Sequence, residues 1–178
     1  KKLLQLKQEA SDFRVNVESE VASFERSAGF SLHENQIAAV KETIENGVQI
    51  VTGGPGTGKT TIVKCILKLF KDLGQKVALC APTGRAAKRL SQATGEEAKT
   101  IHRMLDLDYK NGEGHFTYNE NTRLPVDVVI VDEVSMVDEY VFSALINAME
   151  RGSRLVLVGD KDQLASVGVG NVLNDLIK

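Results

Sequence analysis

The sequence predicts an α/β fold, in which helices flank a parallel sheet. Short runs rich in β-branched residues alternate with longer segments of helical periodicity, the pattern of strands joined by crossover helices. One run holds four consecutive β-branched residues, Val128 to Val131, as expected of a strand buried on both faces. A glycine-rich loop at residues 53–60 separates the first strand-like run from the next helical segment. We therefore expect a ligand site beyond the carboxyl ends of the strands.

The composition is that of one ordinary soluble domain. Hydrophobic residues make up 42% and charged residues 26% of the 178 residues, which is enough apolar material for a single core. Because the net charge is only -2, contact with a polyanion requires a local basic patch. No stretch is long and apolar enough for a membrane and the first residues lack signal-peptide features, so the predicted location is cytoplasmic. Cys65 and Cys80 have no metal-site spacing, and we expect buried free thiols.

The first 27 residues read as a polar segment with an apolar ladder, which predicts one helix or a helix pair. We expect residues 1–27 to be a helical remnant of a preceding domain or a linker, followed by one domain over residues 28–178. Ser31 is the expected N-cap of the next helix, with Glu34 in the capping-box position and an end at 46–47. Gln36 on this helix offers the donor and acceptor that reading an adenine edge requires, although a solvated helix residue is the simpler interpretation.

The glycine-rich loop matches G-x-x-x-x-G-K-T at every position and lies between a strand predicted at 48–51 and a helix predicted to end near 72–74. Glycines let several backbone N–H groups converge on phosphate oxygens, and the helix N-terminus adds its dipole. Lys59 would neutralise the outer phosphates, and the Thr60 hydroxyl would bind Mg²⁺. The alternative is a surface turn that ends in Lys-Thr. The predicted nucleotide-binding residues are Gly54, Pro55, Gly56, Thr57, Gly58, Lys59, Thr60 and Thr61.

A second strand is predicted at 76–81, and a helix follows Pro82-Thr83-Gly84. Arg85, Lys88 and Arg89 fall at i, i+3 and i+4, so one face of this helix carries three cations beside a strand end. Such a face suits a phosphate backbone, but it is also typical of a solvated helix. Residues 106–122 then predict an inserted β-hairpin around an Asn-Gly turn, with aromatic residues that could stack on bases or hold the hairpin to the domain.

The strand predicted at 126–131 ends in two adjacent carboxylates. Asp132 would hold Mg²⁺ through its water shell, and Glu133 would polarise a water for attack on the γ-phosphate, which favours hydrolysis over small-molecule phosphorylation. A helix is expected at 136–149, a strand at 154–158, and a closing helix from about residue 170. At the end of that last strand, Asp160 could support the metal shell and Gln163 could sense the γ-phosphate, although both could simply cap the loop.

The ordered set of these segments resembles RecD-like superfamily 1 DNA helicases over residues 28–178. The matching segments are Thr52–Thr61, Ala81–Ala87, Thr100–Arg103, Val131–Met136 and Gly159–Leu164. The resemblance implies the first RecA-like motor domain of an ATP-dependent translocase that moves 5′ to 3′ on single-stranded DNA. It implies that Gln36 reads adenine, that Lys59, Asp132, Glu133 and Gln163 are catalytic, and that the hairpin is a strand-separating pin. The implied DNA-contacting residues are Pro82, Thr83, Arg85, Thr100 and His102.

In this family ATP is hydrolysed in a cleft between two RecA-like domains, and the second domain supplies arginines. We expect this chain to lack that second domain. Without those arginines, ATP binding with turnover reduced by a factor on the order of 10³ is expected. The implied partners are single-stranded DNA, duplex junctions and subunits of DNA-repair or nuclease complexes. Two alternatives stay open: a P-loop ATPase that remodels protein partners, which would not respond to DNA, and a nucleotide-gated DNA-binding module without unwinding activity.

Overall fold

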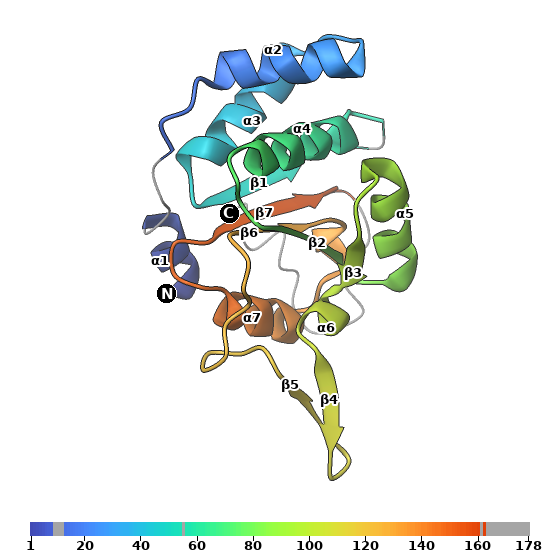
Figure 1. Cartoon of the computed structure of the whole chain (residues 1–178). Coiled ribbons are helices and arrows are strands. Elements are labelled where there is room, and N and C mark those ends of the chain that lie inside the picture. The colour runs from blue at the N-terminus through green and yellow to red at the C-terminus, as the bar shows by residue number, and fades with distance from the viewer. Residues whose placement is uncertain (9–12, 55, 161, 163–178) are drawn as a thin grey trace.

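The computed structural model describes residues 1–8, 13–54, 56–160 and 162. Within these residues a parallel sheet runs in the order β1-β7-β6-β2-β3, and a separate antiparallel pair is formed by β4 and β5 (Figure 1). The strands are β1 (Val48–Thr52), β2 (Val77–Ala81), β3 (Ala98–Thr100), β4 (Leu107–Lys110), β5 (Glu113–Phe116), β6 (Val128–Val131) and β7 (Arg154–Gly159). The helices are α1 (Lys2–Gln8), α2 (Val17–Ala28), α3 (Glu34–Glu45), α4 (Lys59–Asp72), α5 (Gly84–Thr94), α6 (Ile101–Met104), the 3-10 turn η1 (Val134–Met136) and α7 (Glu139–Ala148).

The register of the sheet brings the strand ends to one rim. Val131 at the end of β6 pairs with Cys80 of β2 and with Leu157 of β7, and Thr52 at the end of β1 pairs with Gly159. The side chains of β6 are fully buried, as its run of β-branched residues predicts. The segments that follow β1, β2, β6 and β7 therefore begin within about two residues of one another along the sheet. The predicted α/β fold with a parallel sheet is confirmed.

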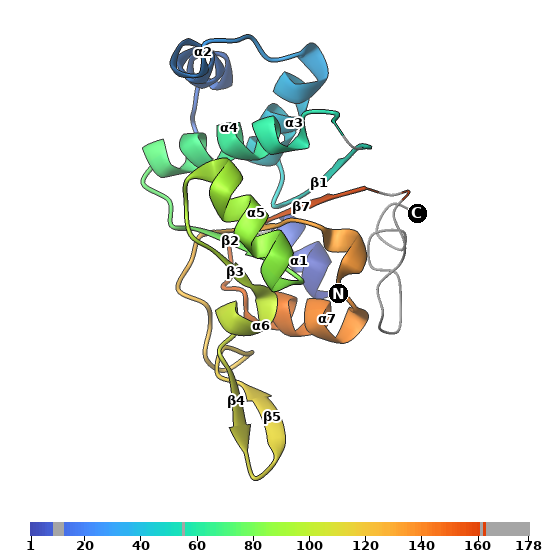
Figure 2. The same cartoon turned by 90° about the vertical axis from the view of Figure 1, so that its right-hand side faces the viewer.

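Helices cover both faces of the sheet (Figures 1 and 2). Apolar side chains of α2, α3, α4 and α5 form one core with one face of the sheet, and those of α1, α6 and α7 form another core with the opposite face. The N-terminal segment was predicted to be one helix or a helix pair, and it is a pair. Its two helices lie on opposite sides of the sheet. Leu6 of α1 belongs to the core that contains α7, and Phe24 of α2 belongs to the core that contains α4. Their assignment to a preceding domain or a linker stays a prediction.

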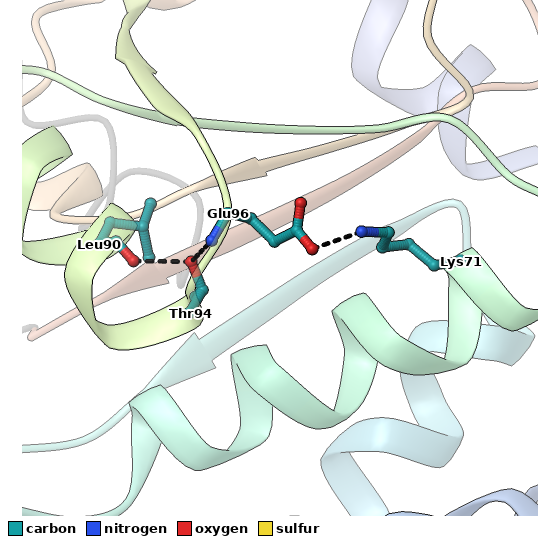
Figure 3. A network of polar contacts seen from close by, with 4 residues as sticks. All are labelled: Lys71, Leu90, Thr94 and Glu96. Atoms are coloured by element: carbon teal, nitrogen blue, oxygen red, sulfur yellow. Dashed lines mark hydrogen bonds and ion pairs between the residues drawn. The ribbon is translucent and has the colours of Figure 1, made fainter.

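The end of α5 is tied to α4 by polar contacts (Figure 3). Lys71 of α4 forms an ion pair with Glu96, which lies just after α5. The Thr94 hydroxyl donates to the Leu90 carbonyl at 2.8 Å and accepts from the Glu96 N–H at 3.3 Å, so it links the last turn of α5 to the chain that leaves it. These contacts hold α5 in place beside α4, and they involve the end of the helix that is far from the rim of the sheet.

The starts of two helices were predicted wrongly, and one strand was not predicted. Helix α3 is capped by His33 rather than Ser31, and Gln36 rather than Glu34 completes the capping box. The reason is that buried Leu32 donates its N–H to Glu25 Oε1 at 2.6 Å, which fixes the chain before the helix. Helix α7 begins at Glu139 rather than at residue 136, because Asp138 caps it by accepting from the Val141 N–H at 2.8 Å. Strand β3 was not expected, since three residues without an apolar run carry no strand pattern.

The expected insertion at residues 106–122 is confirmed as a hairpin. Strands β4 and β5 pair antiparallel and extend away from the sheet (Figure 2). Their turn is Asn111-Gly112, whose φ angles of 55° and 83° are those of a primed two-residue turn. Cys65 and Cys80 are buried free thiols, as predicted, and burial raises the pKa of Cys65 to about 11. Over the described ranges, no helix combines the length and apolar character that crossing a bilayer requires. The closing helix expected from about residue 170 lies outside the described residues.

Candidate functional site

The phosphate loop connects the end of β1 to the first turn of α4. Gly58 is the N-cap of α4 and has a left-handed backbone, so the first N–H groups of the helix have no side-chain cap. The N-terminus of a helix in this state offers donors and a positive dipole end to an anion. Thr60 and Thr61 lie in this first turn, with Thr60 exposed. Pro55 lies outside the described residues.

Two glycines of the loop lie where an added Cβ would meet a neighbouring side chain. At Gly58 φ is +82°, and an added Cβ would lie 2.2 Å from Gln36 Nε2. At Gly53 an added Cβ would lie 2.5 Å from Thr57 Oγ1, and this hydroxyl donates to the Gly54 carbonyl at 2.7 Å. The loop is therefore closed on itself by Thr57 and on α3 by Gln36, and larger residues would open it.

Lys59 extends back across the loop. Its Nζ donates to the Gly53 carbonyl at 2.5 Å, and its side chain is half-buried. A cavity of about 420 Å³ lies beside it, between α3, β1 and α4. The cavity is lined by Gln36, Gln49, Thr57 and Lys59, among others. An ammonium group that is already held over the loop requires little reorganisation to meet a phosphate.

Both ends of the Gln36 carboxamide form hydrogen bonds within the chain. Its Oε1 accepts from the His33 N–H at 2.8 Å, and its Nε2 donates to the Gly58 carbonyl at 3.4 Å. Gln36 thus links the N-terminus of α3 to the phosphate loop, a tertiary contact for which the sequence gives no signal. Reading of adenine by this side chain stays a prediction.

The two carboxylates follow directly after β6. The Asp132 N–H donates to the Cys80 carbonyl at 2.9 Å and extends the sheet ladder, while Asp132 Oδ1 accepts from the Glu133 N–H at 2.9 Å. Burial raises the pKa of the Asp132 carboxyl, against the opposing effects of that hydrogen bond and of the charges on Lys59 and Arg89. Because β1 and β6 both pair with β7 in parallel, the phosphate loop and the two carboxylates follow strand ends at the same rim. Glu133 adopts a left-handed backbone at φ 53°, which is uncommon outside glycine and occurs at functional sites.

The donor set at this rim fits Mg²⁺. Mg²⁺ is bound by one or two protein oxygens together with phosphates and water, and the Thr60 hydroxyl and the Asp132 carboxylate are such oxygens. In the parts of the chain that the structure describes, no cluster of three or more His, Cys, Asp or Glu residues forms a site for a more fully protein-bound metal. Asp160 is buried after β7, and its Oδ1 accepts from the Asp162 N–H at 2.9 Å, so it caps its own loop. Gln163 lies outside the described residues.

The predicted DNA-contacting residues lie at the neighbouring strand ends. Ala81 of β2 pairs with Thr100 of β3, so the segments beginning at Pro82 and at Thr100 leave the same rim. Thr83 caps α5 by accepting from the Ala86 N–H at 3.1 Å, and Thr100 caps α6 in the same way through the Arg103 N–H. Arg85 is exposed. His102 is also exposed, and its ring lies 6.0 Å from that of Phe116 on the hairpin.

One contact at this rim was not anticipated. Arg89 was expected only as part of a basic helix face, but its Nη2 lies 4.0 Å from Glu133 Oε1. The residues are 44 positions apart, and sequence spacing gives no signal for such a pair across two strand ends. One hint of this pair was present in the sequence: Arg89 lies on the helix that follows one strand, and Glu133 follows the neighbouring strand.

A family model described as an AAA domain matches residues 36–169. This chain belongs to the AAA domain family. Its relatives include the ATP-dependent RecD2 DNA helicase of Deinococcus radiodurans, with 41% identity over 82% of this chain and 20% of the relative. They also include the RecBCD enzyme subunit RecD of Mycolicibacterium smegmatis, with 41% identity over 85% of this chain and 31% of the relative. Within the family the chain is a RecD-like superfamily 1 helicase ATPase domain, and it spans less than a third of these relatives.

A solved structure shares the same architecture. The crystal structure of Bacteroides Pif1 bound to single-stranded DNA matches with 26% identity and a TM-score of 0.54 over 82% of this chain and 35% of that chain. The sheet, phosphate loop and helices described above are thus arranged as in the P-loop domain of a helicase.

Proposed function

We propose that this chain is the first of two RecA-like motor domains of an ATP-dependent DNA helicase, which moves 5′ to 3′ on single-stranded DNA. The observation that carries the proposal is that the loop with Lys59, after β1, and the acids Asp132 and Glu133, after β6, lie at the same rim of the sheet, on the two strands that flank β7. The printed names of the relatives, an ATP-dependent DNA helicase and a RecBCD subunit, support ATP, DNA and further subunits as partners. The Pif1 structure with single-stranded DNA supports the same choice of nucleic acid.

The chemistry follows from the residues at the rim. The N–H groups of α4 and the Lys59 ammonium would bind the β- and γ-phosphates of ATP. Mg²⁺, held by Thr60 and Asp132, supplies charge neutralisation to the phosphates when bound. Glu133 accepts a proton from the attacking water, whose oxygen forms a bond to the γ-phosphorus while the bond to the β–γ bridging oxygen breaks. ADP and phosphate are the products, and the second domain adds cationic stabilisation.

The DNA path lies on the neighbouring part of the same rim. The N-termini of α5 and α6 begin there, and Arg85 and His102 are exposed there. Closure of the second domain on ATP would tighten one DNA grip while the other loosens, and hydrolysis would reverse this. A full-length protein that moved 3′ to 5′ on single-stranded DNA would contradict the directional part of the proposal.

Nucleotide binding by the chain itself is tested with Lys59→Ala. In a titration with a fluorescent ADP analogue, this variant should bind about 10-fold or more weakly, since a charge-assisted hydrogen bond to phosphate is lost. The matched control is Lys64→Ala, which removes an exposed lysine of the same helix about 7.5 Å further along its axis. Lys64 lines a groove between α2, α4 and the end of α5, and its loss should leave affinity unchanged. Equal affinities for wild type and Lys59→Ala would remove the basis of the assignment.

A further inference from the structure

Helix α5 lies between the candidate ATP site and the candidate DNA path. Its buried face consists of Ala86, Ala87 and Leu90, which set the rotation of the helix about its axis. Its far end is held to α4 through Glu96 and Lys71 (Figure 3). With this face turned to the core, the cations Arg85, Lys88 and Arg89 lie on the exposed face of the helix.

Arg89 is the cation of α5 that reaches the catalytic acids. Its guanidinium lies 4.0 Å from Glu133 Oε1, and its charge also acts on Asp132. The Glu133 side chain is 23% exposed and that of Arg89 is 65% exposed, so the arginine stays open to a second anion. Arg85 lies one turn earlier on the same helix and is exposed as well. Both guanidiniums are therefore open to solvent, and that of Arg89 also lies beside the Glu133 carboxylate.

We propose that Arg89 is a positioning residue that restrains the Glu133 carboxylate until single-stranded DNA binds. The inference rests on the proposed function and specifies how DNA regulates that site. A DNA phosphate that binds Arg85 and Arg89 competes with Glu133 for the Arg89 guanidinium, because phosphate accepts bidentate hydrogen bonds from arginine. The released carboxylate can then turn to the water that attacks ATP. DNA contacts the Arg89 guanidinium only when Glu133 has left it, so DNA favours the state in which the carboxylate is free.

The test is steady-state ATP hydrolysis by the full-length protein that carries this chain, with and without an oligo(dT) strand. In Arg89→Ala the DNA-free kcat should rise about three- to fivefold, the factor that an ion pair with one exposed partner can hold in an equilibrium. The KM for ATP should not change, and the further stimulation by DNA should fall by a similar factor. Arg89→Lys keeps the charge beside Glu133 and should have the wild-type kcat without DNA, whereas its stimulation by DNA should be weaker because lysine cannot bind a phosphate bidentately. Arg26→Ala, which removes an exposed arginine of α2, is the matched control.

Each outcome separates the inference from the function on which it rests. If DNA stimulates the wild type but Arg89→Ala has a DNA-free kcat equal to or below wild type, the restraint does not exist and the helicase assignment stands. A similar rise in Arg89→Ala and Arg89→Lys would also overturn the inference, because the charge would not matter. If DNA has no effect on the wild type, the proposed function fails and the inference fails with it.

Discussion

At the scale of single residues, contacts within the chain shape the phosphate loop. Thr57 and Lys59 bond to carbonyl groups of the loop, and Gln36 bonds to it from α3. The motif spacing alone predicts Lys59 and Thr60 as phosphate and metal residues. It does not predict that Gln36 occupies the space beside Gly58, since that contact depends on how α3 packs against the loop.

Gly58→Ala should therefore harm both the fold and nucleotide binding. The positive φ alone costs about 1 to 2 kcal/mol for a residue with a Cβ, and the new methyl group would also displace Gln36. Gly74→Ala is the matched control, since φ there is +74° and the described chain has no atom within 4 Å of the added Cβ. Thermal unfolding should show a loss in both variants, and an ADP titration should show weaker binding only in Gly58→Ala. Normal binding by Gly58→Ala would mean that the loop tolerates displacement of Gln36.

At the scale of elements, strong patterns were predicted correctly and capping details were not. The β-branched run of β6, the apolar ladder of α4 and the Asn-Gly turn of the hairpin each follow from local sequence. The start of α3 was wrong because Leu32 is held by Glu25 of another helix, a tertiary contact that outweighs the local preference for serine at the N-cap. Strand β3 was missed because its place in the sheet comes from pairing with β2 rather than from hydrophobicity.

Helix α5 offers a test that separates a structural role of Thr83 from a DNA-binding role. Thr83→Ala should lower the free energy of unfolding by about 1 kcal/mol, because the N-cap bond to the Ala86 N–H is lost. Thr83→Asp retains a capping oxygen and should restore stability in urea denaturation. Its negative charge should nevertheless weaken DNA binding, measured by fluorescence anisotropy with labelled oligo(dT). If Thr83→Asp bound DNA as tightly as wild type, this segment would not lie on the DNA path.

At the scale of the whole molecule, parallel pairing explains why residues far apart in sequence share one site. The ends of β1, β6, β2 and β3 lie on one rim, so the phosphate loop, the carboxylates and the basic helix become neighbours. The order of the motifs predicts this rim, because the carboxyl ends of parallel strands meet at one edge. The Arg89–Glu133 contact could not be predicted in this way, since it depends on the rotation of α5 against the sheet.

The chain spans 20% of the Deinococcus radiodurans relative and 31% of the Mycolicibacterium smegmatis relative, so the activity of the whole protein is a proposal. In that proposal a second domain completes the ATP cleft. The DNA helicase and the ATPase that remodels protein partners differ in their response to DNA. A motor that moves on DNA hydrolyses ATP faster when DNA is bound, whereas an ATPase that remodels proteins has no reason to respond.

The most direct measurement is ATP hydrolysis by the full-length protein with and without single-stranded DNA, beside Lys59→Ala and the control Lys64→Ala. We predict that DNA stimulates the wild type and Lys64→Ala alike, and that Lys59→Ala loses turnover by a factor on the order of 10², as for removal of one preorganised donor at a reacting phosphate. Turnover that depends on Lys59 but is the same with and without DNA would contradict the helicase assignment and favour an ATPase that acts on protein partners.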